Sequence, residues 1–167
     1  MEPVSFKTFR TKLARHRKEY RKFITRTEIK PPKGINAIRP EIEKRVWAEI
    51  DCLSCGNCCK VMTPTFTWPD IIRISAHLGM TAKEFTKRWL KKDEDNGDMV
   101  NVTQPCQFLD LNNNMCSIYE VRPADCAGFP HLTKGKWREY AHVHKQNIDY
   151  CPATFKMIEE LNAMFNS

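Results

Sequence analysis

The sequence contains no run of about 18 apolar residues, so it offers no candidate for a membrane-spanning helix. The first thirty residues are basic and lack the apolar stretch and cleavage site of a secretory signal, so we expect a cytoplasmic protein. There is no P-loop, no Rossmann glycine pattern and no G-x-S-x-G elbow, and the common nucleotide-binding and hydrolase classes therefore find no support. Internal repeats and low-complexity segments are also absent from the sequence.

Cysteine, by contrast, is abundant: the chain has eight, all between Cys52 and Cys151. Stable disulfides are rare in a reducing cytosol. Cysteine-rich intracellular chains more often bind metal or carry out redox chemistry. We therefore expect thiolates that bind metal rather than cystines.

The formal net charge of +7 is concentrated in the first third of the chain. Residues 1–50 hold 14 Lys and Arg against 6 Asp and Glu, whereas residues 51–167 hold 13 against 14. Such an excess can bind an acidic partner through residues 1–30, and it can equally be an ordinary solvated helix face. No aromatic-basic RNA-binding signature and no C-x2-C…H-x3-H spacing is present, so we expect no nucleic-acid partner.

Hydrophobic periodicity predicts a mainly α-helical chain with a small antiparallel β-sheet, an α+β fold. Phe6, Phe9, Leu13 and Tyr20 recur at helical intervals and predict a basic amphipathic helix over residues 4–28. We expect a basic N-terminal helix and linker over residues 1–39 and a cysteine-cluster metal-binding domain over residues 40–167. Further helices are expected at 40–50, 68–79, 81–92 and after Pro152, and short strands at 99–102, 107–109, 116–119 and 137–144.

The first cysteine cluster is the segment Cys52-Leu-Ser-Cys55-Gly-Asn-Cys58-Cys59, in which two C-x2-C steps overlap. This spacing lets a tight loop direct two sulfurs at one metal ion. Adjacent side chains diverge, so Cys58 and Cys59 would serve different metal atoms, or one of them would be a packed thiol. The cluster by itself predicts binding of a soft metal.

Four later cysteines, Cys106, Cys116, Cys126 and Cys151, lie beside prolines or at expected element ends. Ligands in such places can converge without disrupting a core. Eight thiolates suffice for two four-ligand sites, or for one cluster with spare thiols. The negative charge of the thiolates needs an offset, for which Lys60, Arg73 and Arg122 are candidates.

The ordered cysteine motifs resemble those of the CxxCxxCC cysteine-cluster family, also called the YkgJ family, a zinc- or iron-chelating domain. The resemblance covers roughly residues 50–155 and implies a metal or iron–sulfur protein. It rests on C-x2-C-x2-C-C over residues 52–59, Pro-Cys106-x-Phe-Leu, Cys116-x-Ile-Tyr-Glu-x-Arg-Pro-x-x-Cys126-x-x-Phe-Pro and Cys151-Pro.

Thiolates accept both zinc and iron–sulfur clusters. The uneven spacing and the Cys58-Cys59 doublet favour an iron–sulfur cluster, of the 4Fe-4S type, with a redox or enzymatic role that the sequence does not define. The alternative is a zinc-stabilised binding module that docks an acidic partner through its basic N-terminal helix. The sequence assigns no catalytic residue. The predicted metal ligands are Cys52, Cys55, Cys58, Cys59, Cys106, Cys116, Cys126 and Cys151.

Overall fold

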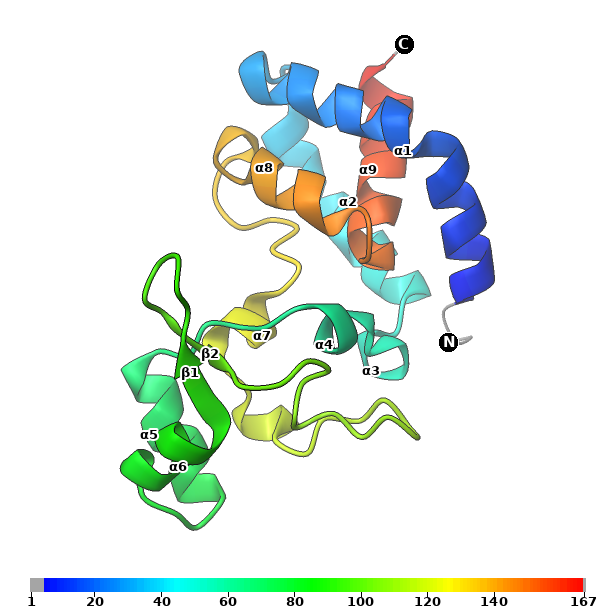
Figure 1. The fold of residues 1–167 in the computed structure, drawn as a ribbon. Helices are drawn as coiled ribbons and strands as arrows, with labels where there is room; N and C mark the ends of the chain where they lie inside the picture. The colour runs from blue at the N-terminus through cyan, green and yellow to red at the C-terminus, as the bar shows by residue number, and fades with distance from the viewer. Residues whose placement is uncertain (1–4, 167) are drawn as a thin grey trace. The chain divides into compact units, whose positions relative to one another are not determined.

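The computed structural model describes residues 5–166, which form two compact units. The terminal unit joins the chain up to Cys55 to the segment from Pro130 onward, and the central unit comprises Gly56–Phe129 (Figure 1). The chain is mostly helical with a two-stranded antiparallel sheet, which confirms the predicted α+β class. The domain boundary expected at residue 39 stays a prediction. Within residues 5–166, none of the helices combines the length and the apolarity that crossing a bilayer requires.

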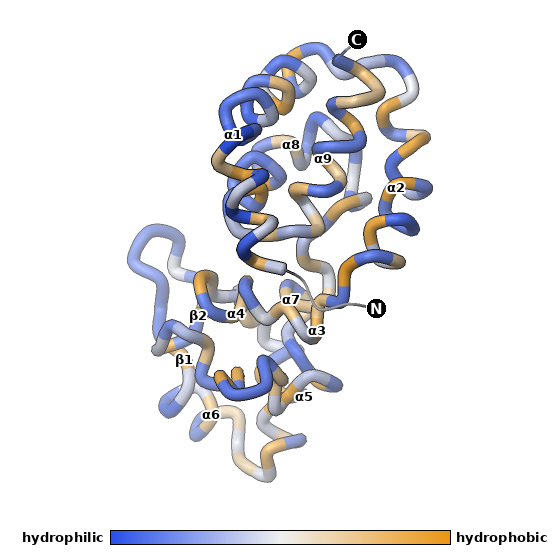
Figure 2. Tube along the Cα trace, turned by 90° about the vertical axis from the view of Figure 1, so that its right-hand side faces the viewer, coloured by the Kyte–Doolittle hydropathy of each residue, from blue (hydrophilic) through white to orange (hydrophobic). Residues whose placement is uncertain are grey.

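The terminal unit is a helical assembly in which α1 packs against α8 and α9, and α2 packs against α9. Its core includes fully buried side chains from each of these four helices, among them Ile24, Ile42, Trp137 and Ile158. Along α2, hydrophilic and hydrophobic stretches follow one another as the helix turns, as Figure 2 shows. The helices of this unit are α1 (Phe6–Ile29), α2 (Ile35–Glu49), α3 (Cys52–Cys55), α8 (Trp137–Asn147) and α9 (Pro152–Phe165).

The basic N-terminal helix forms as predicted, and its apolar side is part of the core. The Ser5 hydroxyl caps its start by accepting a hydrogen bond from the Thr8 amide. Phe23 and Ile24 are almost completely buried, and burying a side chain of this size contributes about 1.5–3 kcal/mol. Helix α1 is therefore an integral part of the terminal unit.

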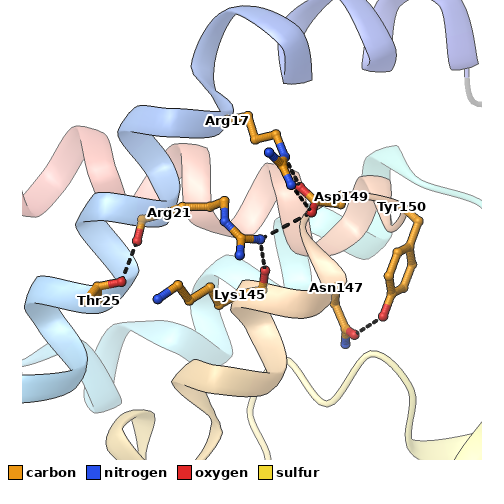
Figure 3. A network of polar contacts seen from close by, with 7 residues as sticks. All are labelled: Arg17, Arg21, Thr25, Lys145, Asn147, Asp149 and Tyr150. Carbon is orange, nitrogen blue, oxygen red and sulfur yellow. Dashed lines mark hydrogen bonds and ion pairs between the residues drawn. The ribbon is translucent and has the colours of Figure 1, made fainter.

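Ion pairs fasten α1 to the turn between α8 and α9 (Figure 3). Arg17 donates two hydrogen bonds to the Asp149 carboxylate, at 2.7 and 2.8 Å. Arg21 Nη1 donates to Asp149 Oδ2 at 3.2 Å and to the Lys145 carbonyl oxygen at 2.8 Å. The hydrogen bonds from Arg17 hold the pKa of Asp149 below its ordinary value.

Helix α2 begins earlier than the sequence indicates. Proline favours a first helical position, but here Gly34 precedes the helix with a φ of +89° and Pro40 lies inside it. Arg39, just before the proline, is 2% exposed. Its guanidinium donates to the carbonyl oxygens of Leu132, at 2.7 and 3.0 Å, and Gly135, at 3.1 Å. These bonds compensate the buried charge and fix the loop that precedes α8.

The strand expected over residues 137–144 is wrong, because this segment forms the helix α8. The Lys136 amide donates to Glu139 Oε2 at 2.8 Å, which caps the helix start. The helical geometry turns His142 outward and buries His144 against the Trp137 ring, with centroids 5.4 Å apart. Burial lowers the pKa of His144 to about 3. His142 and His144 therefore lie on different sides of α8.

The central unit has a core of seven buried side chains: Phe66, Ile71, Ile74, Phe85, Leu90, Phe108 and Ile118. Strands β1 and β2 pair antiparallel with Leu90 opposite Asn101. Thr67 and Thr81 form capping boxes at the starts of α5 and α6. The elements are α4 (Asn57–Val61), α5 (Trp68–His77), α6 (Ala82–Trp89), β1 (Leu90–Lys92), β2 (Met99–Asn101), η1 (Tyr119–Val121) and α7 (Ala124–Gly128).

Candidate metal centre

The central unit contains five of the eight cysteines, and two of them are adjacent on α4. The sulfurs of Cys58 and Cys59 lie 3.9 Å apart. The backbone amide of Cys106 donates to the Cys59 carbonyl oxygen at 2.8 Å. This bond joins the cysteine doublet to a segment that is almost fifty residues further along the chain.

Gly56 permits the tight entry into α4. Its φ of +56° lies in the left-handed region that disfavours other residues. A Cβ atom at this position would lie 2.9 Å from the Asn114 Cβ, which is too close for two carbon atoms. A glycine is therefore needed here for both the backbone angle and the close approach of the loop that precedes Cys116.

Short backbone contacts position Cys116 and Cys126. Leu109 and Cys116 form an isolated antiparallel bridge, and the strands expected at 107–109 and 116–119 are reduced to this bridge. Cys126 lies on α7, and the Ala124 amide at the start of this helix donates to Asp70 Oδ1 at 3.1 Å. The sequence predicts that Asp70 lies at the start of a helix over residues 68–79. It does not indicate that the Asp70 carboxylate also accepts a hydrogen bond from the start of α7.

The thiols of Cys59, Cys106, Cys116 and Cys126 form one group, defined by their electrostatic interactions. All six pairs among them interact, since in each pair the charge of one thiolate raises the pKa of the other. We call these four the thiol quartet. Burial, reinforced by these neighbours, raises the pKa of Cys106, Cys116 and Cys126 above the ordinary thiol value.

Cys59 differs from the other members of the quartet. The hydrogen bond from Cys58 and, to a smaller extent, the charge of Lys60 lower its pKa to about 7, against the effect of burial. Cys59 is thus the thiol of the quartet that is most readily deprotonated near neutral pH.

Two of the three cations expected to offset thiolate charge act on the quartet. Lys60 lowers the pKa of Cys59, and Arg122 lowers that of Cys116. Arg122 also lies over the Tyr119 ring, 3.9 Å from its centroid. Arg73 instead donates to Asp70 Oδ1 at 2.7 Å and to the Arg122 carbonyl oxygen at 2.9 Å.

The terminal unit contains Cys52, Cys55 and Cys151. Cys52 and Cys55 lie on α3, and the charge of Cys55 acts on the Cys151 thiol. Cys151 occupies the N-cap of α9, and burial raises the pKa of its thiol above the ordinary value. The Thr154 hydroxyl is completely buried and has no hydrogen-bond partner within residues 5–166.

The donor set fits a soft metal in its chemistry. None of the eight cysteines forms a disulfide in the described chain. Four thiols with cations beside them match the ligand sets of both zinc and iron–sulfur sites. Within residues 5–166, no group of three or more histidine, cysteine, aspartate or glutamate side chains is arranged so that it could hold a metal ion.

Comparison with known proteins places these cysteines in a family. A family model named CxxCxxCC, with the description "Putative zinc- or iron-chelating domain", matches residues 51–152. The uncharacterized protein MJ0661 of Methanocaldococcus jannaschii is 36% identical over 76 residues. The match covers 45% of this chain and 41% of that protein, so this chain spans less than half the length of the relative. No solved structure matches the chain.

Proposed function

The chain belongs to the CxxCxxCC family of zinc- or iron-chelating domains, and from this premise we propose that its thiol quartet binds the metal. Cys59, Cys106, Cys116 and Cys126 would each supply one thiolate. The observation that carries the proposal is that all four thiols interact with one another inside a single compact unit. Cys52, Cys55, Cys58 and Cys151 stay predicted ligands on the strength of the cysteine motif.

The surroundings of the quartet support metal binding. Buried thiols with raised pKa values are poor ligands until a cation compensates the charge of the thiolates. Lys60 and Arg122 compensate part of this charge, and a bound metal would compensate the rest. Cys59 loses its proton most easily and would be the first ligand to bind.

We propose an iron–sulfur cluster, of the 4Fe-4S type, as the bound group. Four thiolates would complete the coordination of such a cluster, which would then supply one-electron transfer, whereas an iron left without a thiolate would supply Lewis-acid chemistry. The residues of the chain would hold the cluster, partly screen it from water and offset its negative charge. A redox or enzymatic role follows from this assignment.

The test is anaerobic purification followed by analysis of iron, acid-labile sulfide and zinc, together with a visible absorption spectrum. The proposal predicts a brown protein with iron and sulfide in equal amounts. A colourless protein with stoichiometric zinc would indicate that the site binds zinc and not an iron–sulfur cluster. A protein that stays free of both metals after reconstitution would contradict the function itself.

The exposed side of α1 favours a second candidate, a zinc-stabilised module that docks an acidic partner. Lys7, Arg15, Lys18 and Lys22 are exposed on α1, and within residues 5–166 none of the four forms an ion pair like those of Lys12 and Arg17. A row of uncompensated cations attracts an acidic surface. Because α1 belongs to the core, the test is replacement of these four side chains by Glu, not deletion of the helix. Loss of partner binding with unchanged metal content supports docking, and unchanged binding contradicts it.

A further inference from the structure

We propose that His144 makes the terminal unit sensitive to mild acid, because its ring can take up a proton only when α8 separates from α1. The inference goes beyond the proposed function, since it concerns the terminal unit alone and requires no bound metal. It assigns a regulatory role to a histidine of α8 that belongs to none of the cysteine motifs.

His144 occupies an apolar position of its helix. Trp137, Ala141, His144 and Ile148 follow one another at intervals of four, three and four residues, so they lie on one side of α8. Each of these side chains is 0% exposed. This side packs against α1, where Trp137 Nε1 donates to Thr27 Oγ1 at 3.1 Å. An apolar side chain would fill the position of His144 without the cost of burying two ring nitrogens.

Both nitrogens of the His144 ring lack a hydrogen-bond partner within residues 5–166. The ring stacks on that of Trp137, with centroids 5.4 Å apart and an angle of 24° between the planes. A neutral imidazole leaves one donor and one acceptor unsatisfied here, whereas an imidazolium would leave two donors and a charge. The closed structure therefore tolerates the neutral ring far better than the protonated one.

The charges that act on His144 also oppose its protonation. Burial lowers the pKa of His144 to about 3, and the charges of Arg39, His131 and His142 add to this effect. Arg39 belongs to α2, His131 to the loop before α8 and His142 to α8 itself. Acid would increase the positive charge on the two histidines, so their opposition grows as the pH falls.

Carboxylates on the elements packed against α8 are engaged by other groups. Asp149, between α8 and α9, binds Arg17 and Arg21. Glu28 of α1 is not among the groups that act on His144. Other carboxylates of α1, α8 and α9 bind side chains or amides elsewhere, in the pairs Glu19–Asn162, Glu139–Lys136, Glu159–Lys12 and Glu160–Arg45.

Acid should therefore weaken the contact between α8 and α1. A histidine in an open or unfolded chain takes up a proton below about pH 6.5, whereas the pKa of His144 in the closed structure is about 3. Between these two values the open form binds one proton more, so its equilibrium constant increases up to about tenfold for each pH unit of acidification. Asp149 keeps its charge in the upper part of this range, because its pKa lies below its ordinary value.

The test is hydrogen exchange of α8 in the whole chain at about pH 7 and about pH 5, corrected for the intrinsic exchange rates. One additional proton on the open form predicts that the protection factor of α8 decreases about 20-fold between these two conditions. His144→Leu removes the titratable ring. His142→Leu is the matched control, because it makes the same substitution at an exposed position of α8. We expect the control to lose protection like the wild type, and His144→Leu to keep it.

His144→Phe is a second variant, which keeps a flat ring against Trp137 but removes the nitrogens, and it decides if His144→Leu does not fold. Loss of metal in acid would affect all four proteins alike. An equal decrease in the wild type, the control and the His144 variants would therefore overturn the inference, as would unchanged protection in the wild type.

An NMR titration of the wild type provides a check that needs no variant. The Cε1 signal of His144 in the folded protein should remain that of a neutral imidazole down to about pH 5. A ring that is protonated at this pH while α8 stays protected would overturn the inference. None of these outcomes bears on the proposed metal binding, which the metal analysis tests separately.

Discussion

At the scale of single residues, a thiolate site depends on sulfur atoms that cannot be replaced by oxygen. Serine has nearly the same shape as cysteine, but its hydroxyl stays protonated near neutral pH and binds soft metals poorly. In the quartet, each thiol interacts with the three others. Removing one sulfur therefore affects the whole site.

Cys116→Ser should lower the metal content of the purified protein severalfold and destabilise the central unit. Metal binding is coupled to folding in such sites. Ser117→Ala is the control, because Ser117 is the exposed neighbour and only its backbone amide contacts Phe108. Metal analysis and thermal unfolding measure both effects. Equal metal content in the two variants would show that Cys116 is no ligand.

Protonation of Asp70 at low pH should lower the stability of the central unit. Burial alone would raise the pKa of Asp70, but hydrogen bonds from Thr67 and Arg73 outweigh burial and hold the pKa below its ordinary value. A lowered pKa in the folded state gives stability that is present above the unfolded pKa of about 4 and is lost as the pH falls through the folded pKa.

Asp70→Asn should therefore cost about 2 kcal/mol near neutral pH, the value of charged hydrogen bonds, and the loss should shrink in acid. Urea unfolding at several pH values measures it. Glu84→Gln, at the exposed capping box of α6, is the control and should cost less. A loss for Asp70→Asn that does not depend on pH would contradict the assignment.

At the scale of elements, α1 shows how far periodicity can be trusted. Its apolar positions recur every three or four residues, and the observed helix buries them as predicted. A strand is also expected over residues 137–144, because this segment follows Lys134-Gly135-Lys136, which is typical of a hairpin turn. The segment forms α8 because Glu139 caps its start and because α1 provides a surface for Trp137 and His144. The local sequence pattern of residues 137–144 cannot indicate this contact with α1, because the contact depends on the tertiary fold.

Phe23→Ala should destabilise the terminal unit by about 3 kcal/mol, because Phe23 is 2% exposed and packs near the Trp137 ring. Lys22→Ala removes an exposed side chain of the same helix and should change stability little. Chemical unfolding of both variants provides the comparison. Equal stability would mean that α1 is only loosely attached to α8 and α9.

At the scale of the whole molecule, the sequence motif predicts that the ligands are thiolates, but it does not predict which cysteines lie near one another. The spacings of Cys106, Cys116 and Cys126 carry no geometric information of their own. The bridge between Leu109 and Cys116 and the bond from Ala124 to Asp70 fix the segments that carry Cys116 and Cys126. Gly56 and Asn114 show the same dependence, since their close approach joins two distant loops. Contacts of this kind form only when the chain folds.

Removal of the metal should therefore affect the two units unequally. Treatment with a chelator should increase hydrogen exchange most in residues 56–62 and 104–128, which carry the quartet. Helices α1 and α9, which the terminal core stabilises, should change less. A ligand present at 100 times its dissociation constant stabilises the folded state by about 2.7 kcal/mol, so the increase should be readily measured. Equal exchange with and without metal would contradict a stabilising role.

The most direct test of the central claim is X-ray absorption spectroscopy at the edge of the metal found in the anaerobically purified protein. The account predicts a first shell of sulfur atoms only, at about 2.3 Å for either zinc or iron, with additional iron–iron scattering for the proposed cluster. A first shell of nitrogen and oxygen atoms would contradict binding of the metal by the thiol quartet.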